Sequence, residues 1–227
     1  MVKDNLKKVR DRIKVAADRA GRDPSGIILL CVIKGAGCEQ VNEAVRSGVT
    51  DIGENRVQDA VRKYPMIESA GHSPRWHFIG HLQTNKAKKS VEIFDLIHSV
   101  DSLRLAEEIQ RQAEARNKIQ SVLAQVNVSA ERSKYGMPPE GLDGFIKGIG
   151  AMKNLMLLGL MTIAPYSDNP EDSRPYFRRL RELRDVSRRH NSDNIDIKHL
   201  SMGMSSDFEV AISEGADIVR IGSAIFR

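Results

Sequence analysis

The sequence predicts an α/β fold, a single (β/α)8 barrel of the TIM type that is opened by an N-terminal helix. Eight short apolar runs alternate with helical patterns along the 227 residues, and one helical pattern precedes the first run. Such alternation is typical of a parallel sheet, and eight repeats favour its closure into a barrel. The length is slightly below the ~250 residues usual for such barrels, so we expect residues 1–227 to form one domain. An open doubly wound sheet is the alternative, since a strand count taken from a sequence is soft.

The expected elements follow in chain order. A helix over residues 4–20 is indicated by Leu6, Val9 and Ile13, which recur at three- and four-residue steps. Turn residues at 21–26 end this helix, and the wholly apolar run 27–33 is the first buried strand. The other strands are predicted at residues 49–52, 76–79, 96–100, 122–128, 155–163, 197–200 and 218–221. The other helices are predicted at residues 39–47, 56–67, 85–93, 103–116, 139–152, 171–190 and 207–214, and the N-terminal helix supplies the eighth.

The composition indicates a cytoplasmic protein. Charged residues make up 29% of the chain, which is ordinary for a soluble protein, and no window approaches the ~18 apolar residues of a membrane helix. The N-terminus enters a charged helical pattern at once, so we expect no signal peptide and no membrane attachment. Cys31 and Cys38 are expected to be buried or free thiols in a reducing compartment.

The basic charge does not by itself indicate a nucleic-acid partner. The net charge is +5, and the densest basic stretch lies at residues 178–189. There, Leu180, Leu183 and Val186 fall on one helical face and the arginines on the others, which is typical of a solvated helix. No nucleic-acid motif accompanies the stretch, so nucleic-acid binding is disfavoured.

Chemistry in α/β barrels sits at the carboxyl ends of the strands. Lys34 ends the apolar first strand, where loss of water would lower its pKa toward that of a nucleophilic amine. A lysine that extends to solvent from a strand end explains the position equally well.

The loops after the seventh and eighth strands predict a phosphate site. Residues 203–206 precede a helix, and Gly222 and Ser223 follow the last strand, where barrels commonly bind phosphate through backbone N–H groups. Ser206 also fits a capping box with Glu209. Arg220, inside the last apolar strand, needs an acceptor, which is either a carboxylate such as Glu54 or the phosphate ligand.

The histidines do not predict a metal centre. His77 and His81 are four residues apart but lie at a strand end rather than on one helix face. His98 and His199 lie within strands and are expected to be core residues with satisfied ring nitrogens.

Taken together, these segments resemble the pyridoxal phosphate homeostasis protein family, whose fold is like the N-terminal barrel domain of alanine racemase. The resemblance covers essentially the whole chain. The motifs that carry it are GENRVQ at 53–58, WHFIGHLQ at 76–83 with Asn85 and Lys86, HSVDS at 98–102, LSMGMS at 200–205 with DFE at 207–209, and VRIGSAIF at 219–226.

The resemblance implies that pyridoxal 5'-phosphate (PLP) is the cofactor and that Lys34 holds it as a Schiff base. It further implies that Arg220 faces the pyridine nitrogen and that Asn55 lines the pocket. The phosphate would be held by Ser205, Gly222 and Ser223 with the backbone near Met204. One departure is that Ile33 and Gly35 flank the lysine, where the family usually has a serine before it and a threonine or similar residue after it.

The same resemblance favours a carrier over an enzyme. An arginine keeps its proton, so the ring nitrogen stays unprotonated and the cofactor is a poor electron sink. Racemases of the related fold add a tyrosine from a further C-terminal domain, and this chain stops at Arg227. We therefore expect a protein that binds PLP and takes part in vitamin B6 homeostasis without substantial catalysis.

The alternative is an amino-acid racemase of low activity, or a lyase in which Asn127 or Lys134 assists. A third hypothesis is a nucleic-acid or protein partner for the arginine-rich helix. The expected partners are PLP and, as candidates, PLP-dependent apo-enzymes, with a monomer favoured over a dimer.

Overall fold

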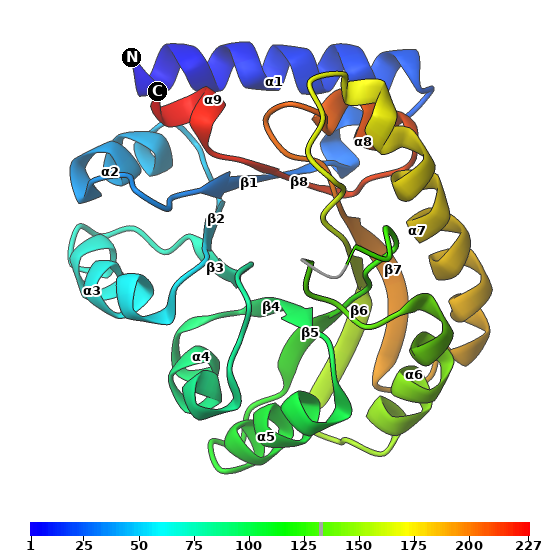
Figure 1. Ribbon diagram of the computed structural model, residues 1–227. Helices are drawn as coiled ribbons and strands as arrows, with labels where there is room; N and C mark the ends of the chain where they lie inside the picture. The colour runs from blue at the N-terminus through cyan, green and yellow to red at the C-terminus, as the bar shows by residue number, and fades with distance from the viewer. Residues whose placement is uncertain (132–133) are drawn as a thin grey trace.

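Eight parallel strands close into a barrel in the computed structural model, which describes residues 1–131 and 134–227 (Figure 1). Each strand pairs with the next along the chain, and the first pairs with the last, with Ile28 opposite Ile218 and Cys31 opposite Ile221. The helices form a ring outside the strands. The predicted fold class is confirmed, and an open sheet is excluded.

The strands are β1 (Ile28–Val32), β2 (Asp51–Glu54), β3 (Arg75–Phe78), β4 (Leu96–Val100), β5 (Gln120–Gln125), β6 (Leu155–Met161), β7 (Ile195–Ser201) and β8 (Ile218–Ile221). The α-helices are α1 (Val2–Arg19), α2 (Cys38–Arg46), α3 (Val57–Glu68), α4 (Ala87–Ile93), α5 (Leu103–Glu114), α6 (Leu142–Gly150), α7 (Arg174–Ser187), α8 (Phe208–Ser213) and α9 (Ser223–Phe226). Short 3-10 turns lie at Pro24–Gly26, Thr84–Lys86, Pro139–Gly141, Pro170–Ser173 and Arg188–His190.

The predicted strand bounds agree best with the structure for two strands whose first and last residues are apolar. The bounds of β4 and β8 are those predicted, whereas β2 begins two residues later than expected. The strand-like run at 49–52 had suggested the earlier start. The strand in the structure contains Asp51 and Glu54, whose polar side chains are buried. The short α9 was not predicted.

Helix α1 covers the seam where the barrel closes. It packs against α2, α8 and α9 and runs across β1 and β8 in Figure 1. The Asn5 amide donates hydrogen bonds to the backbone oxygens of Ile225 (3.0 Å) and Arg227 (3.3 Å), which ties the two ends of the chain together. Leu6, Val9 and Ile13 are buried, as their periodicity predicted.

Two apolar clusters stabilise the barrel. The larger fills the space between strands and helices and includes Trp76, Phe78 and Phe94. The smaller consists of Leu30, Leu96, Leu123, Met161 and Ile218. Apolar side chains alone do not fill the strands' buried faces, because β2, β3, β4, β5, β7 and β8 also bury polar ones.

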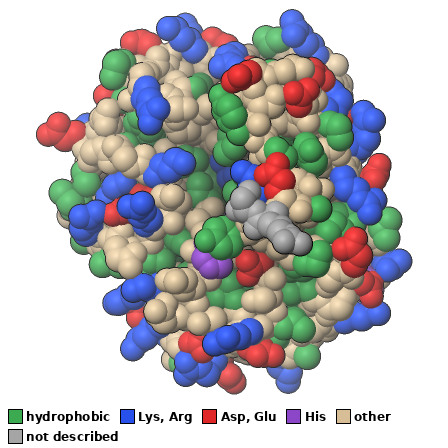
Figure 2. Space-filling view, in the orientation of Figure 1, with side chains coloured by type: hydrophobic (Ala, Val, Ile, Leu, Met, Phe, Trp, Pro, Cys, Tyr) green, Lys and Arg blue, Asp and Glu red, His purple; other side chains and the backbone are tan. Residues whose placement is uncertain are grey.

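The arginine-rich helix α7 is not simply a solvated surface. Leu180 is buried as expected, but Val186 is 58% exposed, so its placement on the buried face was wrong. Arg178 and Arg181 pair with the buried carboxylate of Glu214. On the face shown in Figure 2, basic and acidic side chains are intermixed around the whole rim, rather than gathered into one basic patch.

Both cysteines are free, with Cys31 buried and Cys38 partly exposed. Burial raises the pKa of the Cys31 thiol to about 12. Among the helices of residues 1–131 and 134–227, none combines the length and apolar character needed to cross a membrane.

Candidate functional site

A cavity of about 830 Å³ opens at the carboxyl ends of the strands. This volume lies within the range of small-molecule sites. The predicted cofactor-binding residues all line it: Lys34, Asn55, Met204, Ser205, Arg220, Gly222 and Ser223. The structure thus brings together residues from the ends of β1, β2, β7 and β8, and their role as ligands to a cofactor stays a prediction.

Lys34 lies two residues beyond β1, in the wall of this cavity. Its side chain is exposed, so the expectation that the barrel mouth strips water from the amine is wrong. Gly35, which follows it, has φ = +76°, a conformation that L side chains rarely adopt. The glycine therefore allows a tight turn that leaves the Lys34 amine open to the cavity.

A buried ion pair braces the backbone around Lys34. Lys63 of α3 donates from Nζ to the Ile33 carbonyl oxygen (2.6 Å) and to Glu54 Oε2 (2.9 Å). Glu54, which is fully buried, accepts the Asn55 N–H through its other oxygen at 2.8 Å. One carboxylate thus fixes the loops after β1 and β2, and this role of Lys63 was not predicted.

Arg220 of β8 is a buried cation with neutral partners. Its side chain is 5% exposed, and it donates to Ser201 Oγ (2.8 Å) and to the Thr162 carbonyl oxygen (2.8 Å). Glu54 is engaged by Lys63, so the carboxylate partner considered from the sequence is excluded. Burial lowers the pKa of Arg220 to about 10, so the guanidinium remains charged near neutral pH.

The loop between β7 and α8 approaches the helix closely at Gly203. This glycine has φ = +90°, and a Cβ there would lie 2.5 Å from Ala211 Cβ. The backbone N–H of Met204 donates to Asp207 Oδ1 at 2.6 Å and is therefore not free for a ligand. In the described part of the chain, no hydrogen bond engages the N–H groups of Ser205, Ser206 or Ser223.

The capping box expected for Ser206 is absent from this loop. Asp207, not Ser206, precedes the first turn of α8, and Ser206 is exposed. Glu209, the predicted partner in the box, instead pairs with Arg12 of α1 at 2.6 Å. The prediction was wrong because a long-range ion pair competes with the local one.

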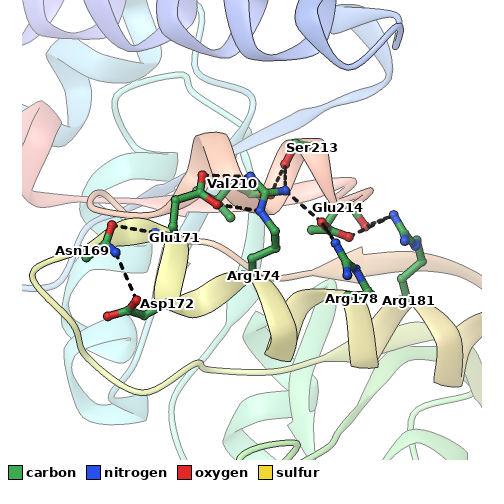
Figure 3. Close-up of polar contacts among 9 residues, drawn as sticks. All are labelled: Asn169, Glu171, Asp172, Arg174, Arg178, Arg181, Val210, Ser213 and Glu214. Atoms are coloured by element: carbon green, nitrogen blue, oxygen red, sulfur yellow. Dashed lines mark hydrogen bonds and ion pairs between the residues drawn. The ribbon is translucent and has the colours of Figure 1, made fainter.

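Helix α8 is held against α7 by a cluster of arginines around Glu214 (Figure 3). The Glu214 side chain is 4% exposed and pairs with Arg174 (2.8 Å), Arg178 (3.3 Å) and Arg181 (3.1 Å). Arg174 also donates to Ser213 Oγ and pairs with Glu171. These contacts fix the helix that follows the Gly203 loop.

Aromatic residues at the cavity mouth were missed by the sequence analysis. The His81 and Tyr135 rings stack at 3.9 Å between centroids and 11° between planes, and Tyr166 is 79% exposed. All three line the cavity. His81 stood in a recognised motif, but nothing in the sequence paired it with a tyrosine 54 positions away.

Asn127 and Lys134, suggested as assisting groups for a lyase, are not among the cavity-lining residues. The Asn127 amide donates to the backbone oxygens of Glu131 and Lys134. His98 is a fully buried core residue with both ring nitrogens hydrogen-bonded, as predicted, whereas His199 is only half-buried. Within residues 1–131 and 134–227, no group of His, Cys, Asp and Glu is arranged to hold a metal ion.

Comparison with known proteins places this barrel in a family. A family model described as "Alanine racemase, N-terminal domain" matches residues 5–227. The chain is 48% identical over 223 residues to the pyridoxal phosphate homeostasis protein of Aquifex aeolicus. The matched region covers 98% of this chain and 96% of that protein. It is 42% identical over 226 residues to the protein of the same name from Pseudomonas aeruginosa, with coverage of 99% and 94%.

Among solved structures, PipY of Synechococcus elongatus with PLP bound matches with a TM-score of 0.88 at 30% identity, over 100% of both chains. The fold and the position of the cavity thus define a barrel of the alanine racemase N-terminal type with a cavity at the carboxyl ends of the strands. The chain belongs to the pyridoxal phosphate homeostasis protein family.

Proposed function

We propose that this protein binds PLP as a Schiff base on Lys34 and holds it for intracellular vitamin B6 homeostasis, without substantial catalysis. The observation that carries the proposal is the convergence of Lys34, Arg220 and the loops after β7 and β8 on one cavity. The names of the relatives and the PLP-bound structure of PipY support the identity of the cofactor.

The residues present fit a phosphorylated aromatic ligand. A buried guanidinium with only neutral acceptors costs free energy, and an anionic or strongly accepting ligand would offset that cost. The N–H groups of Ser205 and Ser223 are free to donate to phosphate oxygens. Because the Met204 N–H is taken by Asp207, we assign the phosphate contact in this loop to the Ser205 amide and hydroxyl.

Lys34 and Asn55, which follow β1 and β2, would complete the site. The exposed Lys34 amine would condense with the cofactor aldehyde, forming a C=N bond and releasing one water. The Glu54–Lys63 pair would keep the backbone at Ile33 and Asn55 in place for this contact.

Arg220 supports a carrier rather than a catalyst. When bound, PLP supplies an electrophilic aldehyde conjugated to a ring whose nitrogen, facing an arginine, remains unprotonated and withdraws electrons weakly. Arg220 keeps its proton at neutral pH, with its pKa at about 10, and would donate a hydrogen bond to that nitrogen without protonating it. PLP-dependent apo-enzymes are the candidate recipients of the stored cofactor.

The direct test is whether a pyridoxyl group is covalently attached to Lys34 after reduction. The purified protein is mixed with PLP, its visible absorbance is recorded, and it is reduced with borohydride for peptide mass analysis. We expect a visible band and a single modified peptide containing Lys34, both lost in Lys34→Ala and both retained in Lys88→Ala, which removes an exposed lysine of α4. Full absorbance in Lys34→Ala would overturn the proposal.

A second measurement separates the carrier from the low-activity racemase or lyase. The loaded protein is incubated with a panel of L- and D-amino acids, and chirality and keto-acid release are followed. We expect no turnover above that of free PLP. Robust turnover of any amino acid, lost in Lys34→Ala, would establish the enzymatic alternative.

A further inference from the structure

A row of buried polar side chains crosses the barrel from the cavity to the opposite end. Arg220 Nη1 lies 2.8 Å from Ser201 Oγ, which lies 2.8 Å from His98 Nδ1. His98 Nε2 lies 2.9 Å from His77 Nδ1, and His77 Nε2 lies 3.0 Å from Asp51 Oδ1. We call these five residues the polar axis, and they come from β8, β7, β4, β3 and β2 in turn.

The Asp51 end of the polar axis lies close to solvent. Asp51 accepts hydrogen bonds from Thr50 Oγ1 (2.7 Å) and Arg75 Nη2 (3.0 Å), and the Arg75 side chain is 60% exposed. All three residues line a second cavity, of about 500 Å³. The polar axis thus joins the wall of this cavity to the wall of the candidate cofactor site.

The two charged ends of the polar axis, with neutral imidazoles between them, set the direction of each hydrogen bond: the Asp51 carboxylate only accepts and the Arg220 guanidinium only donates. In this arrangement Ser201 Oγ accepts from Arg220 and donates its own proton to His98 Nδ1. His98 then carries its proton on Nε2 and donates it to His77 Nδ1. His77 in turn carries its proton on Nε2 and donates it to the Asp51 carboxylate. With both histidines neutral, each donor in the row has one acceptor.

The charges around the axis are consistent with this arrangement. Burial, with the neighbouring His77, Arg220 and His199, holds the pKa of His98 well below its usual range, so this imidazole is neutral. Asp51 is ionised: burial raises its pKa, but hydrogen bonds from His77, Thr50 and Arg75 outweigh this and bring it to about 2.

Burying five polar groups costs more than filling the same space with apolar side chains. The interior offers that alternative, since Leu30, Leu96 and Met161 form an apolar cluster of their own. The polar axis constrains the Arg220 side chain. Without His98 as its acceptor, the Ser201 hydroxyl could rotate, and the guanidinium would lose a fixed hydrogen-bond partner.

We propose that Ser201, His98, His77 and Asp51 are positioning residues that hold the Arg220 guanidinium in one orientation through neutral contacts, with no ion pair to a carboxylate among the described residues, so that its charge is presented to the ligand in the cavity. The effect on the ligand rests on the proposed function. The hydrogen-bond directions do not, and they are tested separately.

The first test uses purified protein without added cofactor. Long-range 15N–1H correlation spectra of the histidine rings, assigned with His77→Gln, His98→Gln and His199→Gln variants, report which nitrogen is protonated. We expect His98 to be a neutral Nε2–H tautomer at pH 7 and His77 to carry a proton on Nε2. A protonated His98 Nδ1, or a doubly protonated His98, would overturn the proposal whether or not PLP binds.

The second test measures the PLP dissociation constant, the wavelength of the visible band and the pH profile of that band. We expect Ser201→Ala and His98→Phe to weaken binding by about tenfold and to shift the band, because a positioned, charge-assisted contact is lost. Ser201→Thr, which keeps the hydroxyl, should restore both. Asp51→Asn, which keeps an acceptor oxygen for His77, should change affinity by less than about threefold.

His199→Gln is the matched control, because His199 is a barrel histidine that is not part of the polar axis. It should leave affinity, band and pH profile unchanged. Wild-type affinity and absorption in both Ser201→Ala and His98→Phe would overturn the proposal. If the unmodified protein itself binds no PLP, the proposed function fails, while the tautomer spectra still decide the structure of the polar axis.

Discussion

At the scale of single residues, Arg220 is a buried charge that the fold satisfies with neutral acceptors. Its guanidinium is buried beside a serine hydroxyl and a threonine carbonyl rather than a carboxylate. A paired arginine would be more stable in the empty cavity but less available to an anion or a ring nitrogen. Under the proposed function, the free energy of folding that an ion pair would have contributed is exchanged for ligand affinity.

Replacing Arg220 tests this balance. In Arg220→Met, two hydrogen bonds of about 1 kcal/mol each are lost, and the relief of a buried charge offsets them. We expect the free energy of unfolding in urea to change by about 1 kcal/mol or less, while PLP affinity falls by about tenfold or more. Arg220→Lys, which keeps the charge but not the paired N–H donors of the guanidinium, should have a PLP affinity between those of the parent protein and Arg220→Met. Large destabilisation with unchanged affinity would show that the residue is only structural.

Asp51 makes the stability of the barrel dependent on acid. Its pKa is about 2 in the folded protein, against ~3.9 for an unfolded aspartate. A lowered folded pKa stabilises the protein above the unfolded pKa, so about 2 kcal/mol should be lost as pH falls from about 5 toward 2. Urea unfolding at a series of pH values should show this loss in the parent protein and not in Asp51→Asn. The exposed Asp193→Asn is the control, and an identical pH dependence in all three would contradict the assignment.

At the scale of elements, the helices and strands were predictable because their apolar periodicity is local. β4 and β8 were placed to the residue, and β2 was misplaced where Asp51 and Glu54 interrupt the apolar pattern. The polar axis could not be predicted, since it joins side chains up to 103 positions apart whose partners depend on the barrel register. Lys34 and Arg220 could be proposed in advance because each stands out within an apolar strand.

The contact between α7 and α8 depends on one buried carboxylate. Hydrogen bonds from the surrounding arginines outweigh burial and lower the pKa of Glu214, so it is ionised (Figure 3). In Glu214→Gln three arginines lose their shared counter-ion, and we expect the free energy of unfolding to fall by about 1–3 kcal/mol, less than for a fully buried pair because the arginines are partly exposed.

The control for Glu214→Gln lies on α7, the helix that carries the three arginines. Glu182 pairs with Arg179, and both side chains are 53% exposed, so Glu182→Gln should change stability by less than about 0.5 kcal/mol. Both variants are compared by urea denaturation at the same ionic strength. Equal effects of the two substitutions would show that the buried cluster contributes no more than a surface pair.

At the scale of the whole molecule, the candidate site lies across the closure of the barrel. β7 and β8 are paired in register only at Ser201 and Ile218, whereas β1 and β8 pair over four positions. The loops after β7 and β8 and the end of β1 all line the cavity. A ligand that contacts all three would therefore link β7, β8 and β1 across both the short β7–β8 pairing and the seam where the barrel closes, and would stabilise the barrel as a unit.

Thermal unfolding tests this linkage together with the expectation of one domain. By calorimetry we expect one cooperative transition. PLP at a hundred times its dissociation constant should raise the midpoint temperature by about 5–10 °C. Binding at that concentration contributes about 2.7 kcal/mol, and the midpoint of a chain of this size shifts by about 2–4 °C per kcal/mol. Pyridoxamine 5'-phosphate, which has the ring and phosphate but no aldehyde, should raise the transition less in the parent protein and by the same amount in Lys34→Ala. Two separate transitions would contradict the single domain. A shift with PLP that is no larger than the shift with inorganic phosphate would contradict a ligand that spans the seam.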